Sequence, residues 1–233
     1  MAATTGKTAL IIGASRGLGY ALAAEYLARG WQVTATVRNA RLTGLHDLAK
    51  SSRGRLVVET VDITFPEQVA ALRGRLARAK FDLLFVNAGV TNGPEETVAD
   101  VSTESFVRLM VTNALSPMRV VEALQDLVAP DGTIGVMSSG QGSIANNDKG
   151  GFEVYRASKS ALNQLMRSFA ARHAGDPRTL LLIAPGWVQT DLGGPAAPLT
   201  IDQSIPGVAD TIDSQAGKGG LRYLDYHGQA VRW

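Results

Sequence analysis

The sequence lacks cysteine, a large net charge and any long hydrophobic run. With no cysteine among 233 residues, disulfide bonds, thiol catalysis and thiolate metal sites are excluded. The formal charge of +2 comes from scattered basic residues and gives no support for a nucleic-acid groove or a membrane patch. The apolar run 9–12 is too short for a signal peptide or a membrane span. We therefore expect a cytoplasmic protein that binds neither nucleic acid nor a membrane, and no metal site.

The length and composition fit one folded domain. Apolar residues make up 45% of the chain and charged residues 19%, so a sizeable core can be buried and disorder is not expected. A second domain is not expected at 233 residues. We therefore predict a single domain spanning residues 1–233.

Short β-branched runs alternate with longer segments of helical spacing. This alternation is typical of a parallel sheet covered by helices on both faces. The pattern predicts strands over residues 8–12, 32–37, 56–61, 83–86, 133–137 and 180–183, and helices over roughly 18–28, 42–49, 66–79, 103–128 and 155–173.

A glycine-rich turn follows the first predicted strand directly. Glycine there would let the backbone approach a pyrophosphate with no Cβ in the way. The next helix would then point its N-terminal amides at the phosphates. A glycine triplet alone is equally compatible with an ordinary strand-to-helix turn, but its place at the first strand–helix junction favours a dinucleotide site. The residues expected to hold the phosphates are Gly13, Ser15, Arg16, Gly17, Leu18 and Gly19.

The end of the second predicted strand indicates the type of nicotinamide cofactor. An acidic residue at this point would bind the ribose 2′-hydroxyl of NAD. The chain instead has Arg38, and Arg16 lies inside the glycine turn. Two guanidinium groups suit a 2′-phosphate, although both arginines could also be solvated surface residues. We predict NADP(H) as the cofactor.

Further motifs follow the glycine turn in a specific order. They are Asn87-Ala88-Gly89, Asn113, Ser139, Tyr155-xxx-Lys159 and Pro185-Gly186. Together with the glycine turn they resemble the short-chain dehydrogenase/reductase family over nearly the whole chain. The resemblance implies an α/β fold: one doubly wound Rossmann-type domain with a mostly parallel seven-stranded sheet and helices on both faces.

Two longer stretches narrow the resemblance to one branch of the family. Residues 138–146 and 185–195 are similar to the C-factor and sniffer-like carbonyl reductases, a branch that also tends to end in a segment like 224–228. Ile12 departs from the family, which usually has threonine before the first glycine, and this puts one turn-stabilising hydrogen bond in doubt. The gap between Ser139 and Tyr155 is also longer than in typical members, a feature that the branch shares.

The chemistry of the candidate catalytic residues can be argued directly. Tyr155 and Lys159 are four residues apart on a predicted helix, so they share a face. A nearby ammonium would lower the pKa of Tyr155 toward neutrality and let it exchange a proton with a substrate oxygen. Ser139 would hold that oxygen by a hydrogen bond. Each residue alone is as well explained by a surface or turn position; the set indicates catalysis.

Asn113 is followed four residues later by Pro117 in the same predicted helix. Because proline has no N–H, the carbonyl of Asn113 loses its usual helical partner and becomes free to bind water. In the family, the matching asparagine holds a water that relays protons to the lysine. A simple packing kink would explain Pro117 equally well.

The resemblance implies several more cofactor contacts. Asp62 and Thr190 could equally have turn-forming roles. Trp187 would lie at the mouth of the pocket or, alternatively, in the core beneath the loop. The implied contacts are Asp62 and Ile63 at the adenine, Asn87, Ala88 and Gly89 along the cofactor, Tyr155 and Lys159 at the ribose, and Pro185, Gly186, Val188 and Thr190 at the nicotinamide.

These motifs favour an NADP(H)-dependent oxidoreductase acting on a small carbonyl or alcohol substrate. One alternative is a nucleotide-binding signalling protein of the C-factor type with little turnover, which would have no need of Tyr155 and Lys159 together. Another is an epimerase or dehydratase of the same family, but those usually have longer substrate regions. The family commonly forms dimers or tetramers through its two long helices, so a homodimer or homotetramer is expected.

Overall fold

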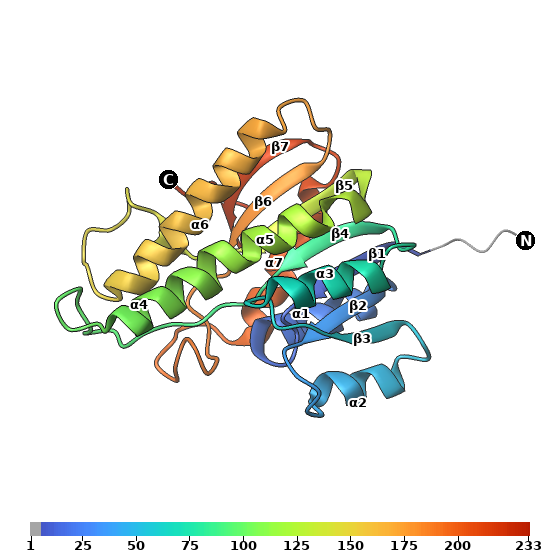
Figure 1. Cartoon of the computed structure of the whole chain (residues 1–233), viewed down its shortest axis with the longest axis horizontal. Coiled ribbons are helices and arrows are strands. Elements are labelled where there is room, and N and C mark those ends of the chain that lie inside the picture. The colour runs from blue at the N-terminus through green and yellow to red at the C-terminus, as the bar shows by residue number, and fades with distance from the viewer. Residues whose placement is uncertain (1–5) are drawn as a thin grey trace, which may run out of the picture.

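A computed structural model describes residues 6–233 and shows a seven-stranded sheet in which every strand pairing is parallel (Figure 1). The strand order is β3-β2-β1-β4-β5-β6-β7, so the chain winds outward from β1 in both directions. The strands are β1 (Thr8–Ile12), β2 (Gln32–Val37), β3 (Leu56–Thr60), β4 (Phe81–Val86), β5 (Val128–Met137), β6 (Thr179–Ala184) and β7 (Gly220–Asp225).

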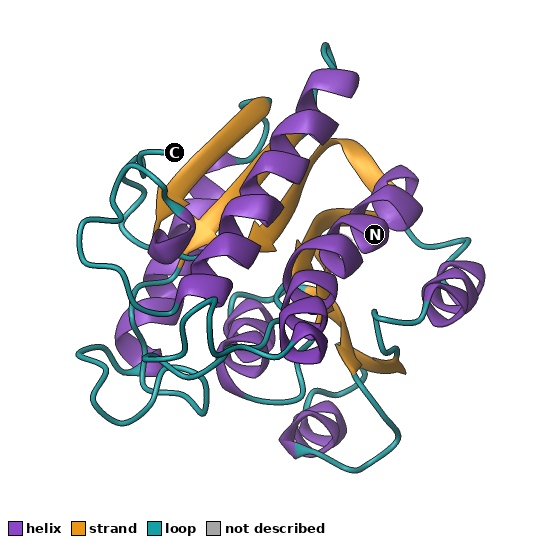
Figure 2. Ribbon diagram, turned by 60° about the vertical axis from the view of Figure 1, so that its left-hand side comes forward, coloured by secondary structure: helices purple, strands orange, loops and turns teal. Residues whose placement is uncertain are grey.

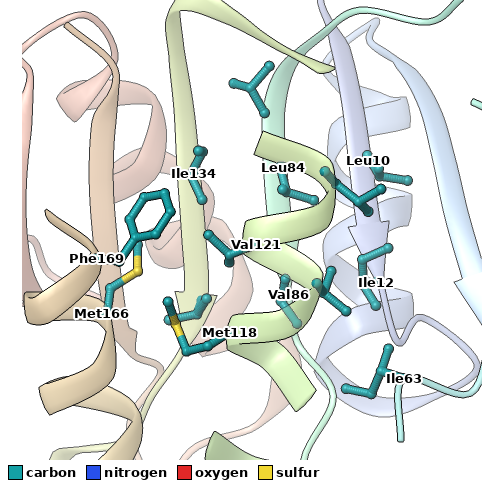
Figure 3. Close-up of a cluster of buried hydrophobic side chains, with 14 of the residues drawn as sticks. Leu10, Ile12, Ile63, Leu84, Val86, Met118, Val121, Ile134, Met166 and Phe169 are labelled. Atoms are coloured by element: carbon teal, nitrogen blue, oxygen red, sulfur yellow. The ribbon is translucent and has the colours of Figure 1, made fainter. Parts of the chain in front are cut away.

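Helices cover both faces of the sheet, as Figure 2 shows. Successive strand residues point to opposite faces. Leu10 and Ile12 therefore join one buried cluster with α3, α5 and α6, part of which is drawn in Figure 3, while Ala9 and Ile11 join a second cluster with α1 and α7. The helices are α1 (Gly17–Ala28), α2 (Gly44–Ser51), α3 (Pro66–Arg75), α4 (Thr103–Met110), α5 (Ser116–Leu124), α6 (Glu153–Arg172) and α7 (Ile201–Gln215).

The doubly wound α/β fold is confirmed, with two differences in its elements. β7 and α7 were not located from the sequence pattern. The segment predicted as one helix over 103–128 is helical as far as Leu127, but it contains a π-helical turn (Val111–Leu115) between α4 and α5, and Val128 already belongs to β5. Pro117 lies in the first turn of α5, where the missing N–H of a proline is best tolerated.

The π-helical turn places a widened ring of backbone at the candidate catalytic asparagine. The N–H of Ser116 donates to the carbonyl of Val111, five residues earlier, and Asn113 lies inside this turn. Such turns are rare and occur frequently at functional sites. Over residues 6–233, no helix is both long and apolar enough to cross a membrane.

Candidate active site

The parallel sheet brings the sequence motifs to one edge. In open α/β sheets, ligands bind outside the carboxyl ends of the strands. Six of the candidate residues lie one or two positions beyond the end of a strand at this edge, from six different strands. They are Gly13 after β1, Arg38 after β2, Asp62 after β3, Asn87 after β4, Ser139 after β5 and Pro185 after β6.

The glycine turn is packed so closely that side chains would not fit. Gly13 has a φ of 87°, and a Cβ on it would lie 3.0 Å from the backbone nitrogen of Ala88. A Cβ on Gly19 would lie 2.1 Å from the carbonyl oxygen of Gly13, which also accepts a hydrogen bond from Asn87 Nδ2 at 3.0 Å. Gly17, with a φ of 56°, opens α1. The turn is therefore held against the end of β4, as a cofactor-binding turn requires.

Thr36 supplies the hydrogen bond that Ile12 puts in doubt. The N–H of Gly13 donates to Thr36 Oγ1 at 3.0 Å, and the N–H of Ala14 donates to the carbonyl oxygen of Thr36 at 2.7 Å. Thr36 is completely buried on the neighbouring strand β2. The hydroxyl that stabilises the glycine turn thus comes from Thr36 on β2. The sequence pattern does not show that Thr36 lies beside the turn, so this role could be recognised only in the structure.

The N-terminus of α1 is suited to an anion. No side chain caps its first amides, and its first turn contains no acidic residue. Free amides and the helix dipole favour a phosphate at such a position. The exposed side chain of Arg16 pairs with the equally exposed Asp191 at 2.8 Å, across from the loop after β6, while Arg38 is exposed at the end of β2. These residues fit a phosphorylated dinucleotide.

The candidate catalytic residues converge beneath this edge. Tyr155 and Lys159 are both buried on α6, with the Lys159 nitrogen 5.8 Å from the centre of the Tyr155 ring. Lys159 Nζ donates to the carbonyl oxygen of Met137, the last residue of β5, at 2.9 Å. Ser139 lies two residues further along, and its side chain is near enough to the Tyr155 hydroxyl to influence the pKa of Tyr155. The serine, tyrosine and lysine therefore form one cluster.

The expected lowering of the Tyr155 pKa is wrong for this arrangement. Burial raises the pKa of Tyr155 to about 12, and the nearby Ser139 side chain opposes this rise only in part. Burial also lowers the pKa of Lys159 to about 8. Desolvation disfavours both charged forms and here outweighs the pairing of a phenolate with an ammonium. At neutral pH, Tyr155 is therefore a neutral phenol that can donate a proton.

The Asn113 side chain joins three parts of the chain. It accepts the N–H of Val90 at 2.8 Å, and its Nδ2 donates to the Val90 carbonyl at 2.8 Å and to Ser158 Oγ at 2.9 Å. Ser158 in turn donates to the carbonyl of Tyr155 at 2.7 Å. Asn113 is completely buried. The Asn113 amide thus joins the loop after β4 to the start of α6. No motif in the sequence pointed to Ser158 as one of its partners.

A loop after β4 also holds the start of α6. The N–H of Tyr155 donates to Asn92 Oδ1 at 3.2 Å, and the N–H of Phe152 donates to the carbonyl of Pro94 at 2.9 Å. Phe152 has a φ of 51°, a left-handed conformation that is uncommon for a bulky side chain. The sequence reasoning missed Asn92; an amide side chain in a turn close to the Asn87 motif is the signal that would have suggested it.

Several residues that were expected to contact the cofactor make hydrogen bonds or packing contacts within the protein. Asp62 accepts hydrogen bonds from the N–H and hydroxyl of Thr64 at 3.0 and 2.6 Å. Thr190 accepts the N–H of Gly193 at 3.0 Å. Both therefore have turn-forming roles. Ile63, Val188 and Leu18 contribute to packing, Gly186 has a φ of 87°, and Gly89 faces Asn113 and Lys159.

Trp187 is a surface residue. Its side chain is 55% exposed, which rules out a core tryptophan beneath the loop. The indole N–H donates to the carbonyl of Gly193 at 2.7 Å, so the ring lies over its own loop. The loop between β6 and α7 therefore carries an exposed aromatic surface directly after the Pro185-Gly186 turn.

A family model and several solved structures are similar to this chain over most of its length. The family model described as short chain dehydrogenase matches residues 7–198. A short-chain dehydrogenase/reductase structure from Burkholderia multivorans with bound NADP is 61% identical, with a TM-score of 0.96, over 98% of this chain and 100% of that one. A carbonyl reductase from Pseudomonas aeruginosa PAO1 in complex with NADP is 37% identical, with a TM-score of 0.90, over 98% and 100%.

A curated relative supports the narrower resemblance. The C-signal protein of Myxococcus xanthus is 36% identical over 154 residues, which cover 65% of this chain and 92% of that protein. The predicted similarity to the C-factor and carbonyl reductase branch is therefore confirmed.

Proposed function

Because the chain belongs to the short-chain dehydrogenase family, we propose that it is an NADP(H)-dependent oxidoreductase that interconverts a small carbonyl compound and its alcohol. The observation that carries this proposal is the convergence of Ser139, Tyr155 and Lys159 at the carboxyl edge of the sheet, beside the glycine turn. A protein that only bound the nucleotide would have no need of this cluster.

The choice of NADP(H) over NAD(H) rests on charge. Arg38 directly follows β2, where an acidic residue would repel a 2′-phosphate, and Arg16 lies immediately before α1. Guanidinium groups bind phosphates through several hydrogen bonds at once. Two similar proteins, from Burkholderia multivorans and Pseudomonas aeruginosa, were crystallised with NADP. Lys159, Tyr155 and the segment from Pro185 to Thr190 would hold the nicotinamide half.

The proposed proton donor is the Tyr155 phenol. The cofactor, when bound, supplies a hydride to the carbonyl carbon, and the carbonyl oxygen then needs one proton to become a hydroxyl. Tyr155, neutral at pH 7 because burial raises its pKa to about 12, gives that proton, and the reverse reaction returns it. Ser139 donates a hydrogen bond to the same oxygen while negative charge develops on it.

Two further residues would return a proton to Tyr155. Lys159 lies 5.8 Å from the tyrosine ring, and its pKa of about 8 lets it release and regain a proton near neutral pH. The Asn113 side chain uses both of its N–H groups on Val90 and Ser158, so it has no donor left for a water. Its backbone carbonyl, beside Pro117, would be the acceptor that holds a water.

Oxidation of NADPH in the presence of aldehydes, ketones and quinones tests the proposal. We expect at least one carbonyl class to be reduced, with NADH a poorer cofactor. Tight NADPH binding with no reduction of any carbonyl would favour the alternative of a nucleotide-binding protein with little turnover, toward which the similarity to C-signal points.

A homodimer or homotetramer is proposed from the surfaces of the long helices. Phe106 on α4, Leu115 in the π-helical turn and Leu165 on α6 are each 39% exposed. Apolar side chains gathered on adjoining helices favour association with another copy of the chain. Sedimentation at several concentrations would measure the oligomeric state, and a monomer throughout would contradict the proposal.

A further inference from the structure

Tyr223, on the last strand, contacts the turn that carries Ser139. It lies on β7 opposite Leu182 of β6, and its side chain is only 3% exposed. Its hydroxyl donates a hydrogen bond to the carbonyl oxygen of Ser139. Residues in the interior of β7 need only be apolar to fill the core, so a buried phenol whose oxygen reaches the catalytic serine requires another explanation.

Ser139 itself accepts two backbone hydrogen bonds from the turn that it begins. The same carbonyl of Ser139 accepts the N–H of Gly142 at 2.8 Å, and Ser139 Oγ accepts the N–H of Gln141 at 3.1 Å. With one lone pair used by Gln141, the serine hydroxyl keeps its proton for donation toward Tyr155 and a substrate oxygen. The direction of that O–H therefore depends on how the backbone of Ser139 is oriented.

The buried side chains of Ser138 and Asn163 also stabilise the turn that begins at Ser139. Ser138 Oγ donates to Asn163 Oδ1 at 2.6 Å, and Asn163 Nδ2 donates to the carbonyl of Gly142 at 3.1 Å. Asn163 and Ser138 are also near enough to the Tyr223 hydroxyl to oppose, in part, the rise in the Tyr223 pKa that burial causes. Buried polar networks of this kind are rigid when all their members are satisfied. Tyr223 thus connects the network to the catalytic serine.

The segment after β7 holds the loop that follows the turn. The Trp233 ring lies 5.6 Å from the Tyr223 ring and is covered by the Arg167 guanidinium at 4.8 Å. The carbonyl of Trp233 accepts the N–H of Ala145 at 3.0 Å, and Arg232 donates to Asn146 Oδ1 at 2.7 Å. Tyr223 is therefore fixed in place by neighbours that also hold the loop after Ser139.

We infer that Tyr223 is a positioning residue for catalysis, which holds the Ser139 backbone so that the serine hydroxyl points at the reacting oxygen. This inference rests on the proposed function. Tyr223 itself does not touch the reacting atoms. Tyr223 acts through Ser139. Removing the Tyr223 hydroxyl should therefore affect catalysis only while the Ser139 hydroxyl is present.

The test is Tyr223→Phe, which keeps the buried ring and its contact with Trp233 but removes the hydroxyl. We expect kcat for carbonyl reduction to fall roughly tenfold or more, because small misplacements of a catalytic group are costly. The KM for NADPH should change less than about twofold, because the cofactor turn is untouched. In the Ser139→Ala background, Tyr223→Phe should have no further effect on kcat.

Tyr26→Phe is the matched control. Tyr26 is completely buried, and its hydroxyl hydrogen-bonds Asp213 at 3.3 Å between α1 and α7, away from the site. Both variants lose a buried hydroxyl and some stability, but only Tyr223→Phe should lower kcat. Equal kcat values for Tyr223→Phe and wild type, or an undiminished effect of Tyr223→Phe in the Ser139→Ala background, would overturn the inference while leaving the proposed function intact.

A second measurement needs no turnover. Amide hydrogen exchange at Gln141 and Gly142 reports the two hydrogen bonds made to Ser139. It should be faster in Tyr223→Phe and unchanged in Tyr26→Phe. Unchanged exchange in Tyr223→Phe would overturn the inference about Tyr223. Failure of the wild-type chain to reduce any carbonyl is a different result, and it would overturn the proposed function.

Discussion

The Lys159 ammonium nitrogen lies 5.8 Å from the centre of the Tyr155 ring, one helical turn away on α6. Both side chains are buried, so burial raises the pKa of Tyr155 to about 12 and lowers that of Lys159 to about 8. Above pH 8, both side chains are therefore mainly neutral. The neutral lysine affects how the stability of the fold varies with pH, and the neutral tyrosine affects whether reduction or oxidation is favoured at a given pH.

The first prediction concerns stability as a function of pH. Below pH 8, Lys159 is protonated in both the folded and unfolded states; between pH 8 and 10.5, only the unfolded state retains the proton. The unfolded state then binds more protons, so wild-type stability rises with pH in this window, by at most about 3 kcal/mol. In Lys159→Met, this rise should be absent.

Melting temperatures of both proteins between pH 7 and 10 would measure the effect. The expected result is that wild type gains stability relative to Lys159→Met as the pH increases. Lys149→Met, in the exposed loop before α6, is the control and should follow wild type. A constant difference between wild type and Lys159→Met over this range would show that Lys159 is not a buried, easily neutralised lysine.

The second prediction concerns the direction of the reaction. Carbonyl reduction needs Tyr155 as a protonated phenol, which its pKa of about 12 ensures throughout the neutral range. Alcohol oxidation needs the phenolate, whose population rises about tenfold per pH unit below that pKa. The kcat for reduction should therefore be flat from pH 6 to 9, while the kcat for oxidation should increase with pH. Oxidation independent of pH would contradict Tyr155 as the base.

The third prediction concerns cofactor choice. Arg38→Asp places a carboxylate where the 2′-phosphate of NADPH is expected, and should weaken NADPH binding by tenfold or more while affecting NADH little. Fluorescence titration with both cofactors measures the two Kd values. Arg78→Asp changes the same charge at an exposed position after α3 and should alter neither. Equal losses of NADPH and NADH affinity in Arg38→Asp would remove the basis for NADP(H) preference.

The fourth prediction concerns Pro117. Pro117→Ala restores an N–H four residues after Asn113, where it can bond the Asn113 carbonyl and replace the π-helical turn with an α-helical one. We expect stability within about 1 kcal/mol of wild type, intact NADPH binding and lower turnover. Pro206→Ala, the same change inside α7, is the control and should keep full turnover. Full turnover in Pro117→Ala would mean that the proline serves packing alone.

The fold and the proximity of the candidate catalytic residues could be predicted from the sequence because both depend on local patterns. Strand-to-helix alternation determines a parallel sheet, and the carboxyl ends of its strands bring Gly13, Asn87 and Ser139 to one edge. The helical spacing of Tyr155 and Lys159 similarly gives their shared face. These features follow from the order of elements, whatever the details of packing.

The features that were missed depend on contacts between distant segments. Thr36 supports the glycine turn from another strand, and Tyr223 reaches Ser139 across 84 positions of the chain. The raised pKa of Tyr155 depends on how completely the packed helices exclude water, which residue spacing does not reveal. The π-helical turn before Pro117 was also missed, because the spacing over 103–128 indicated a helix but not its type.

The central claim is that Tyr155 transfers the proton during NADPH-dependent carbonyl reduction. The most direct test compares kcat and NADPH affinity of wild type and Tyr155→Phe on the best carbonyl substrate, since this change removes a single hydroxyl. We expect an unchanged Kd for NADPH and a loss in kcat of about 10²- to 10⁴-fold. Near-normal turnover by Tyr155→Phe would contradict the central claim.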